Sequence, residues 1–237
     1  MLSKKTLICL LVLSALQGNK AYAFPNFPGG RLAVELGLNY STFDYHQELF
    51  YIWEDVNWRT VYSGGLYCEL PITPKLSVAP GLRFLQYGDR VEVDYMESDQ
   101  TVVTSWSGHF DMTQNYLALP VRIRIYPTVG RNIYLIGGPE FGYLLSAHAK
   151  NKLIINETFI SDTSIVTYDN AKQEITDDLN RFHLSIGAGI GYRIPIGIHA
   201  GLTEIRYSRG LLGSAKPDRW FSDWKVQGFE FLVGFIW

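Results

Sequence analysis

The sequence predicts an all-β fold, an eight-stranded antiparallel up-and-down transmembrane β-barrel with short periplasmic turns and long extracellular loops. Three observations lead to it. The last segment, Trp224–Trp237, alternates an apolar face with a face of glycine and glutamate. A secretory signal opens the chain, and short and long connections alternate between strand-like segments. This combination is typical of strands that face lipid on the outside and a narrow polar lumen on the inside.

The first 23 residues are predicted to be a signal peptide that is cleaved. Lys4 and Lys5 give a positive start, residues 7–16 form an apolar run too short for a spanning helix, and Ala21–Ala23 has the small-residue cleavage pattern. Residues 24–237 then form a single outer-membrane barrel domain. Cys68 is the only cysteine after residue 23, so no intramolecular disulfide is expected.

The strands are expected as eight alternating segments between turn signals. They are residues 31–41, about 60–72, about 76–96, about 101–126, 132–147, 181–194, 198–208 and 224–237. The phase of the seventh is ambiguous. Short turns follow the second, fourth and sixth strands, and the long connections are about 42–59, 95–108, 149–180 and 209–223. Strands three and four are expected to continue as a hairpin that turns near residues 97–100, with a similar extension within residues 149–180.

Charged side chains fall at inward positions of these strands. Carboxylates and guanidiniums are nearly balanced, and an unpaired buried charge is costly, so a network across the lumen is expected. Its predicted members, with His183, are Glu35, Glu69, Arg83, Arg122, Arg124, Glu140, Arg193, Glu204, Arg206 and Glu230. We interpret it as a plug that holds the barrel's shape rather than a gated path, because side chains fill an eight-stranded lumen.

An aromatic patch is predicted in the first long connection, formed by Phe50, Tyr51, Trp53 and Trp58. It is either a ligand-binding surface or part of the outer interfacial girdle, where Trp and Tyr are favoured. Ser146 and His148 could join an acid in a hydrolase triad, although their spacing gives no support because triads are defined by geometry. The histidines have no metal-ligand spacing, and no cofactor is expected.

Several stretches resemble the PorT-like outer-membrane β-barrel proteins, relatives in shape of the small OmpA/OmpX-type barrels. They include LAVELGLNYS, GLYCELPITPKLSVAPGLRF, NYLALPVRIRIYP, IYLIGGPEFGYLLS, GAGIGYRI and IRYSRGL. The aromatic terminus, Phe235 and Trp237, looks like the signal that the barrel-assembly machinery recognises. One member of that family is tied to protein secretion, but no residue here carries that role over.

These patterns favour a non-enzymatic, monomeric barrel in the cell outer membrane, with a structural or surface-interaction role. The alternatives are a narrow pore for small solutes, an accessory barrel of a secretion or assembly system, and a membrane-embedded lipid hydrolase. Expected partners are outer-membrane lipid or lipopolysaccharide, the assembly machinery during insertion, and an extracellular or secretion-system protein. The chain has 21 basic and 23 acidic residues without a basic cluster, which argues against nucleic acid.

Overall fold

The computed structural model describes residues 30–44, 55–98, 102–127, 132–159, 163–169, 172–214 and 224–237. The predicted signal peptide lies outside these ranges. Residues Arg31–Trp237 form one compact unit. Within the described ranges, no helical segment has the length and apolarity of a transmembrane helix.

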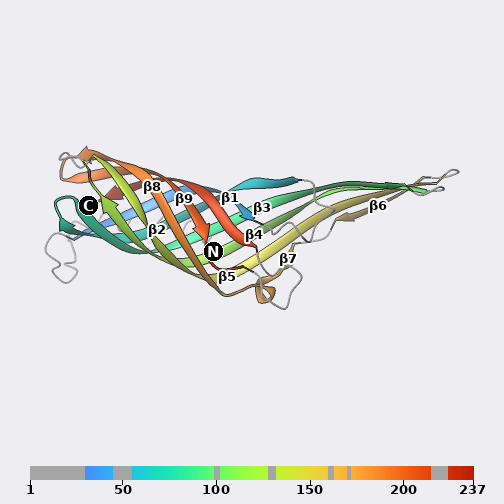
Figure 1. Ribbon diagram of the computed structural model, residues 1–237, viewed down its shortest axis with the longest axis horizontal. Coiled ribbons are helices and arrows are strands. Elements are labelled where there is room, and N and C mark those ends of the chain that lie inside the picture. Colours follow the sequence, from blue (N-terminus) through green and yellow to red (C-terminus); the bar gives the residue numbers. More distant parts are fainter. Residues whose placement is uncertain are drawn as a thin grey trace, which may run out of the picture. The chain divides into compact units, whose positions relative to one another are not determined.

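The unit is built from strands (Figure 1). They are β1 (Arg31–Asp44), β2 (Asp55–Thr73), β3 (Leu76–Ser98), β4 (Val102–Ile125), β5 (Ile133–Phe159), β6 (Thr163–Asp169), β7 (Gln173–Glu174), β8 (Phe182–Ile196), β9 (His199–Gly210) and β10 (Lys225–Ile236). A short 3₁₀ helix, η2, spans Thr176–Asp178.

Eight of these strands close into an antiparallel barrel, which confirms the predicted fold class. The order runs from β4 through β3, β2 and β1 to β10, β9, β8 and β5, and pairing of β5 with β4 closes the ring. The first and last strands pair along their length, from Ala33 opposite Ile236 to Asp44 opposite Lys225. Closure leaves no free edge on the barrel, which satisfies the backbone hydrogen bonds of a lipid-exposed sheet.

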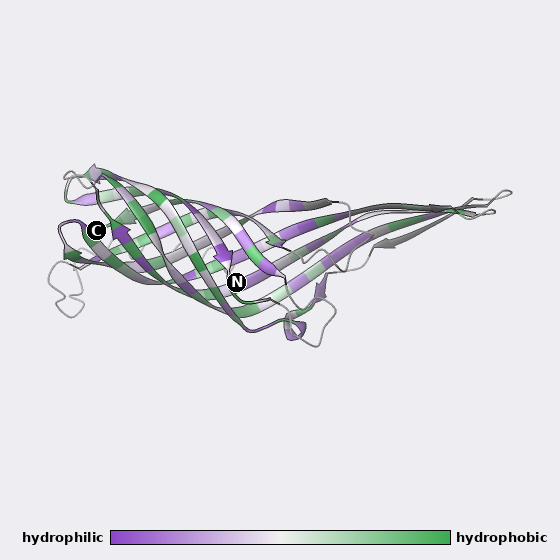
Figure 2. Cartoon of the chain, viewed as in Figure 1, coloured by the Kyte–Doolittle hydropathy of each residue, from purple (hydrophilic) through white to green (hydrophobic). Residues whose placement is uncertain are grey.

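Side chains alternate between the two faces of each barrel strand, as Figure 2 shows in the hydropathy along the ribbons. Large apolar side chains such as Leu36, Leu66 and Ile190 remain half or more exposed on the outside. In β9, Glu204 and Arg206 are buried while Ile205 is exposed, so the structure decides the phase that the sequence left open. The alternation follows from the two-residue period of a β-strand.

Strands β3, β4 and β5 continue past the ring as an extension (Figure 1). Strands β3 and β4 remain paired up to Ser98 opposite Val103, and β5 pairs with β6 as far as Thr158 opposite Thr163. Both extensions were expected, but β5 runs to Phe159 rather than ending at residue 147. It is longer because β4 and β6 supply hydrogen-bonding neighbours for it on both sides.

The buried apolar side chains form two clusters inside the barrel rather than one core. The mouth cluster lies toward the extension, and the turn cluster lies toward the short turns. The mouth cluster comprises Phe43, Leu85, Tyr87, Met112, Tyr116, Ala118, Leu144, Ala147, Leu179, Trp224 and Val226. The turn cluster comprises Ala33, Tyr67, Ala79, Tyr126, Tyr134, Ile136, Ala200, Leu202 and Ile236.

Candidate functional site

The predicted charges come together inside the barrel, between the two apolar clusters. The structure places five glutamates and five arginines there. They are Glu35, Glu69, Glu140, Glu204, Glu230, Arg83, Arg122, Arg124, Arg193 and Arg206. Five negative and five positive groups make the set neutral. Each carboxylate lies within 4.0 Å of at least one guanidinium nitrogen, and shared partners link all ten side chains into one network.

The middle of the network is a bidentate pair. Arg122 Nη1 and Nη2 donate to the two carboxylate oxygens of Glu35, each at 2.6 Å. Arg206 links this pair to its neighbours, with Nη2 3.1 Å from Glu230 Oε2 and 3.6 Å from Glu35 Oε1. Bidentate guanidinium–carboxylate geometry is the strong form of this interaction.

On the mouth side, Arg83 bridges two carboxylates from distant strands. Its Nη2 donates to Glu230 Oε1 at 2.5 Å, and its Nη1 donates to Glu140 Oε2 at 3.2 Å. The planar guanidinium fork allows one arginine to join β5 to β10 across the lumen. Gly65 makes room for it, because a Cβ there would lie 2.5 Å from Arg83 Cβ.

On the turn side, two arginines share Glu69. Arg193 Nη2 donates to Glu69 Oε2 at 2.5 Å, and Arg124 Nη1 lies 3.7 Å from the same oxygen. Arg124 Nη2 also donates to Glu204 Oε1 at 2.9 Å. The side chain of Arg124 is 0% exposed, whereas that of Arg193 is 11% exposed, so solvent contact at this end of the network falls on Arg193.

Tyrosines complete the turn side, and the candidate residues chosen from the sequence did not include them. Tyr126 and Tyr134 donate their hydroxyls to Glu69 and Glu204, at 2.5 and 2.6 Å. The guanidinium carbon of Arg124 lies 4.6 Å from the centroid of the Tyr67 ring. Cation–π contact strengthens when the pair is desolvated, as here. The two-residue alternation of β2 in the sequence places Tyr67 on the inward face. The sequence does not show that Arg124 is its cationic partner.

His183 lies in the lumen, but at the mouth rather than among the charges. Its ring centroid is 5.0 Å from that of Tyr116 and 5.5 Å from that of Tyr87. Within the described ranges it makes no ion pair. His183 therefore belongs to the aromatic packing that seals the network on this side.

The predicted aromatic patch is only partly described, because Phe50, Tyr51 and Trp53 lie outside the described residues. Trp58 belongs to β2 rather than to a loop. Its ring centroid lies 5.2 Å from that of Tyr40 and 5.9 Å from that of Phe229, both on the outer face of the barrel. Trp58 therefore lies on a strand and not in a loop, and the two interpretations of the patch, a ligand-binding surface or an interfacial girdle, stay predictions.

The predicted terminal signal lies at the other end of the barrel. The rings of Phe235 and Trp237 stack with centroids 6.2 Å apart, and Trp237 is exposed on the outside. Recognition of these residues by the assembly machinery stays a prediction.

Ser146 and His148 point to the outside of β5, above the exposed apolar side chains. Ser146 Oγ accepts a hydrogen bond from Asn115 Nδ2 at 2.9 Å. Among the described residues no hydrogen bond joins Ser146 to His148, so the pair lacks the nucleophile–base contact of a triad. No grouping of histidine, cysteine and carboxylate side chains suited to a metal ion occurs within the described ranges.

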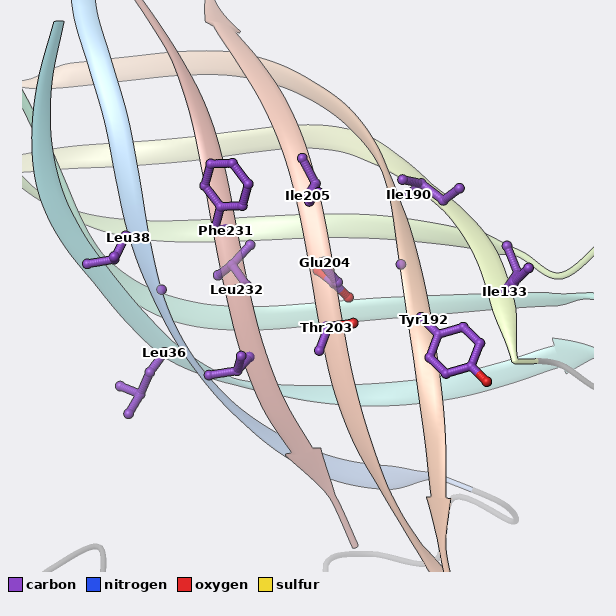
Figure 3. Close-up of a pocket in the computed structure, with 13 residues that line it drawn as sticks. Leu36, Leu38, Ile133, Ile190, Tyr192, Thr203, Glu204, Ile205, Phe231 and Leu232 are labelled. Atoms are coloured by element: carbon purple, nitrogen blue, oxygen red, sulfur yellow. The ribbon is translucent and has the colours of Figure 1, made fainter.

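The outer surface also carries an apolar pocket of about 820 Å³ across β1, β10, β9 and β8. Figure 3 shows Phe231, Ile205 and Ile190 along it. Glu204 contributes to the floor, but its carboxylate is bound to Arg124 in the lumen. The pocket offers space for a hydrocarbon chain, and its lining is mainly apolar apart from residues such as Thr203 and Tyr192.

Comparison with known proteins gives a family match over most of the chain. A family model described as an outer membrane protein beta-barrel domain matches residues 28–215. No curated protein matches the sequence. Similar solved structures include Ail of Yersinia pestis, crystallised with the heparin analogue sucrose octasulfate, at 13% identity and a TM-score of 0.40; 88% of this chain and 99% of Ail are covered.

Two further structures are similar at this level. OprG of Pseudomonas aeruginosa has 11% identity and a TM-score of 0.38, with 87% of this chain and 94% of OprG covered. Neisserial surface protein A has 9% identity and a TM-score of 0.36, with 87% and 97% covered.

Proposed function

Because the chain belongs to the family of outer membrane protein β-barrel domains, we propose that it is a closed, non-enzymatic barrel that presents a β-sheet extension at the cell surface. The protein is located in the outer membrane. The short turns would then face the periplasm and the extension the exterior, the usual arrangement of such barrels.

The observation that carries this proposal is the sealed, neutral lumen. Its five arginines and five glutamates are paired, and apolar clusters lie on both sides of them. A water-filled path would need charged groups in contact with solvent, whereas Arg83 and Glu35 have side chains only 2% and 3% exposed. The narrow-pore alternative therefore has less support than a plug.

The extension supports a surface-interaction role. In the pairings of the described residues, Val93–Ser98 of β3 have β4 as a neighbour on one side only, since the pairing of β2 with β3 reaches no further than Glu92. A one-sided strand offers N–H and C=O groups to an added strand of another protein. An accessory role in a secretion or assembly system, the narrower idea attached to PorT-like barrels, would use the same edge.

Closure is tested by conductance. The purified barrel, shown to be folded by a boiling-dependent shift in gel mobility, is added to a planar bilayer in potassium chloride. We expect no steady conductance. Steady single-channel currents from the folded protein would overturn the plug and favour the pore.

Sidedness is tested by cysteine labelling of intact cells. In a Cys68→Ser background, Met96→Cys marks the extension and Ile198→Cys marks a short turn; the native side chains are 70% and 86% exposed. A membrane-impermeant maleimide should label residue 96 on intact cells and residue 198 only after the outer membrane is opened. The reverse pattern would contradict the proposed orientation.

A further inference from the structure

A polar groove of about 660 Å³ lies on the outer face of β2 to β5, where the barrel passes into the extension. The lumen network does not use it, and its residues come from four neighbouring strands and from Lys172 before β7. The groove is outside the barrel, so a ligand could reach it only from the membrane surface or from solvent.

The side chains below and within the groove change abruptly from apolar to polar. The last apolar row across β3, β4 and β5 is Phe84, Leu117 and Tyr143. The next row is a chain of hydrogen bonds: Gln86 Nε2 donates to Asn115 Oδ1 at 2.7 Å, and Asn115 Nδ2 donates to Ser146 Oγ at 2.9 Å. An outward face that switches in one row from apolar to amide and hydroxyl groups marks the edge of the hydrocarbon layer.

A bulge in β2 builds one wall of the groove. The pairing of β2 with β3 shifts register between Trp58 and Ser63. Asn39 and Ser41 of β1 reach β3 directly, where Asn39 Nδ2 donates to Gln86 O at 2.7 Å and Ser41 Oγ donates to Gly88 O at 2.9 Å. Bulges re-aim side chains and recur next to functional sites.

The bulge directs Arg59 across the outside of β3. Arg59 Nη1 donates to Thr113 Oγ1 at 3.0 Å, and a Cβ at Gly88 would lie 3.2 Å from Arg59 Cδ. A side chain at position 88 would crowd the crossing arginine. A second register shift, between Asn115 and Tyr116 of β4 in its pairing with β5, adjoins the opposite wall and places Ser146 on the outside.

The charges of the groove are mainly positive. Arg59, Lys150 and Lys172 line it, and the one lining carboxylate, Asp111, is held by Arg90 through hydrogen bonds of 2.7 and 3.0 Å. Within the described ranges, none of the three lining cations is in an ion pair. Arg59 Nη1 is held by Thr113, and the charge of Arg59 also acts on Asp111, so an anion would meet chiefly the two lysine ammonium groups and the remaining N–H groups of Arg59.

We propose that this groove binds the phosphorylated sugar headgroup of a glycolipid in the outer leaflet, the chemistry of lipopolysaccharide. Phosphate would lie against Arg59, Lys150 and Lys172, and sugar hydroxyls against the row of Gln86, Asn115 and Ser146. Exposed apolar side chains at the lower rim, Tyr62 and Leu145, would contact the acyl chains. The inference deepens the proposed function and rests on its extracellular placement of this face.

The test measures binding of diphosphorylated lipid A to the folded barrel in detergent micelles. The groove variant is Lys150→Gln with Lys172→Gln, and its matched control is Arg31→Gln with Lys75→Gln, which removes two exposed cations at the turn end. We expect the groove variant to lose affinity by about tenfold or more, since basic groups at a membrane surface attract anionic lipid additively. The control should bind like the native protein.

A second variant and two further probes make the result decisive. Arg59→Gln should by itself weaken the binding of lipid A. Dephosphorylated lipid A should bind weakly to the native protein, with about the affinity that diphosphorylated lipid A has for the groove variant. Equal binding by the groove variant and the control would overturn the proposal. Inorganic phosphate is the second probe. If phosphate at the same concentration as lipid A displaced all of the bound lipid A, the proposal would also be overturned, because the groove would then be a site for a small anion. Conductance and labelling are independent readouts, so failure here leaves the closed barrel unaffected.

Discussion

The lumen and the extension use the same kind of ion pair in opposite surroundings. Arg122 and Glu35 meet inside the barrel at 2.6 Å with side chains 4% and 3% exposed. Arg90 and Asp111 meet outside at 2.7 Å, and the arginine side chain is 45% exposed. Geometry alone does not set what a pair contributes, because desolvation makes an orphaned buried charge costly while water replaces a lost surface partner.

Removing the arginine from each pair should give the largest difference between the two regions. Arg122→Ala leaves Glu35 buried with Arg206 at 3.6 Å as its remaining cation within 4.0 Å, and should lower the free energy of unfolding by about 3–5 kcal/mol. Arg90→Ala should cost about 1 kcal/mol or less. Urea unfolding of the barrel in phospholipid vesicles, followed by tryptophan fluorescence, measures both.

The double variant Arg122→Met with Glu35→Leu sharpens this prediction. It removes both charges and fills similar volume, so it should be more stable than Arg122→Ala alone. Equal losses for Arg122→Ala and Arg90→Ala would mean that the lumen charges are solvated, contrary to their burial.

The second prediction concerns Gly65, whose lack of a side chain leaves space for Arg83 of the lumen network. Gly65→Ala would put a Cβ 2.7 Å from Leu82 O and into the path of Arg83, and should cost about 1–3 kcal/mol of unfolding free energy. Gly201→Ala is the matched control, because its nearest neighbour would be at an ordinary 3.5 Å. The same urea titration applies, and a Gly65→Ala barrel as stable as Gly201→Ala would show that Arg83 can move without loss.

Protonation of the exposed Arg90–Asp111 pair by acid should produce the smallest of these effects. Burial would raise the pKa of Asp111, but the hydrogen bond from Arg90 and the nearby charge of Arg59 lower it below its usual value. A carboxyl with a lowered pKa stabilises the fold above its unfolded pKa, and this contribution is lost as pH falls through the folded pKa. The gain should be about 1 kcal/mol or less, because the pair is partly exposed.

Asp111→Asn is the variant that isolates this contribution. The difference in melting temperature between native protein and variant should be present at neutral pH and shrink as the pH is lowered below about 4, near the unfolded pKa of aspartate. A difference that stays constant with pH would mean that Asp111 acts through packing rather than through its charge.

Much of the barrel could be predicted from the sequence because the relevant signal is local. The two-residue period of a strand separates Glu35 from Leu36 and His183 from Phe182 without knowledge of any neighbour. The paired extension of β3 and β4 followed from β-prone sequence on both sides of a turn. The phase of β9 could not be predicted from the sequence, because the alternation of apolar and polar residues is irregular near His199. Only the pairing of β9 with β8 and β10 fixes which side chains face the lumen.

The sequence by itself determined the eight strands, the two faces of every barrel strand except β9, and the balance of inward charge. Tertiary structure alone decided which charges meet, as with Arg83 and Glu230, which are 147 positions apart. It also decided that tyrosines close the turn side and that bulges in the pairing of β2 with β3 and of β4 with β5 shape an outer groove. The physical reason is that the face of the strand on which a residue lies follows from the two-residue period of the strand itself. The partner that a side chain meets across the lumen depends instead on the register of every strand around the closed ring.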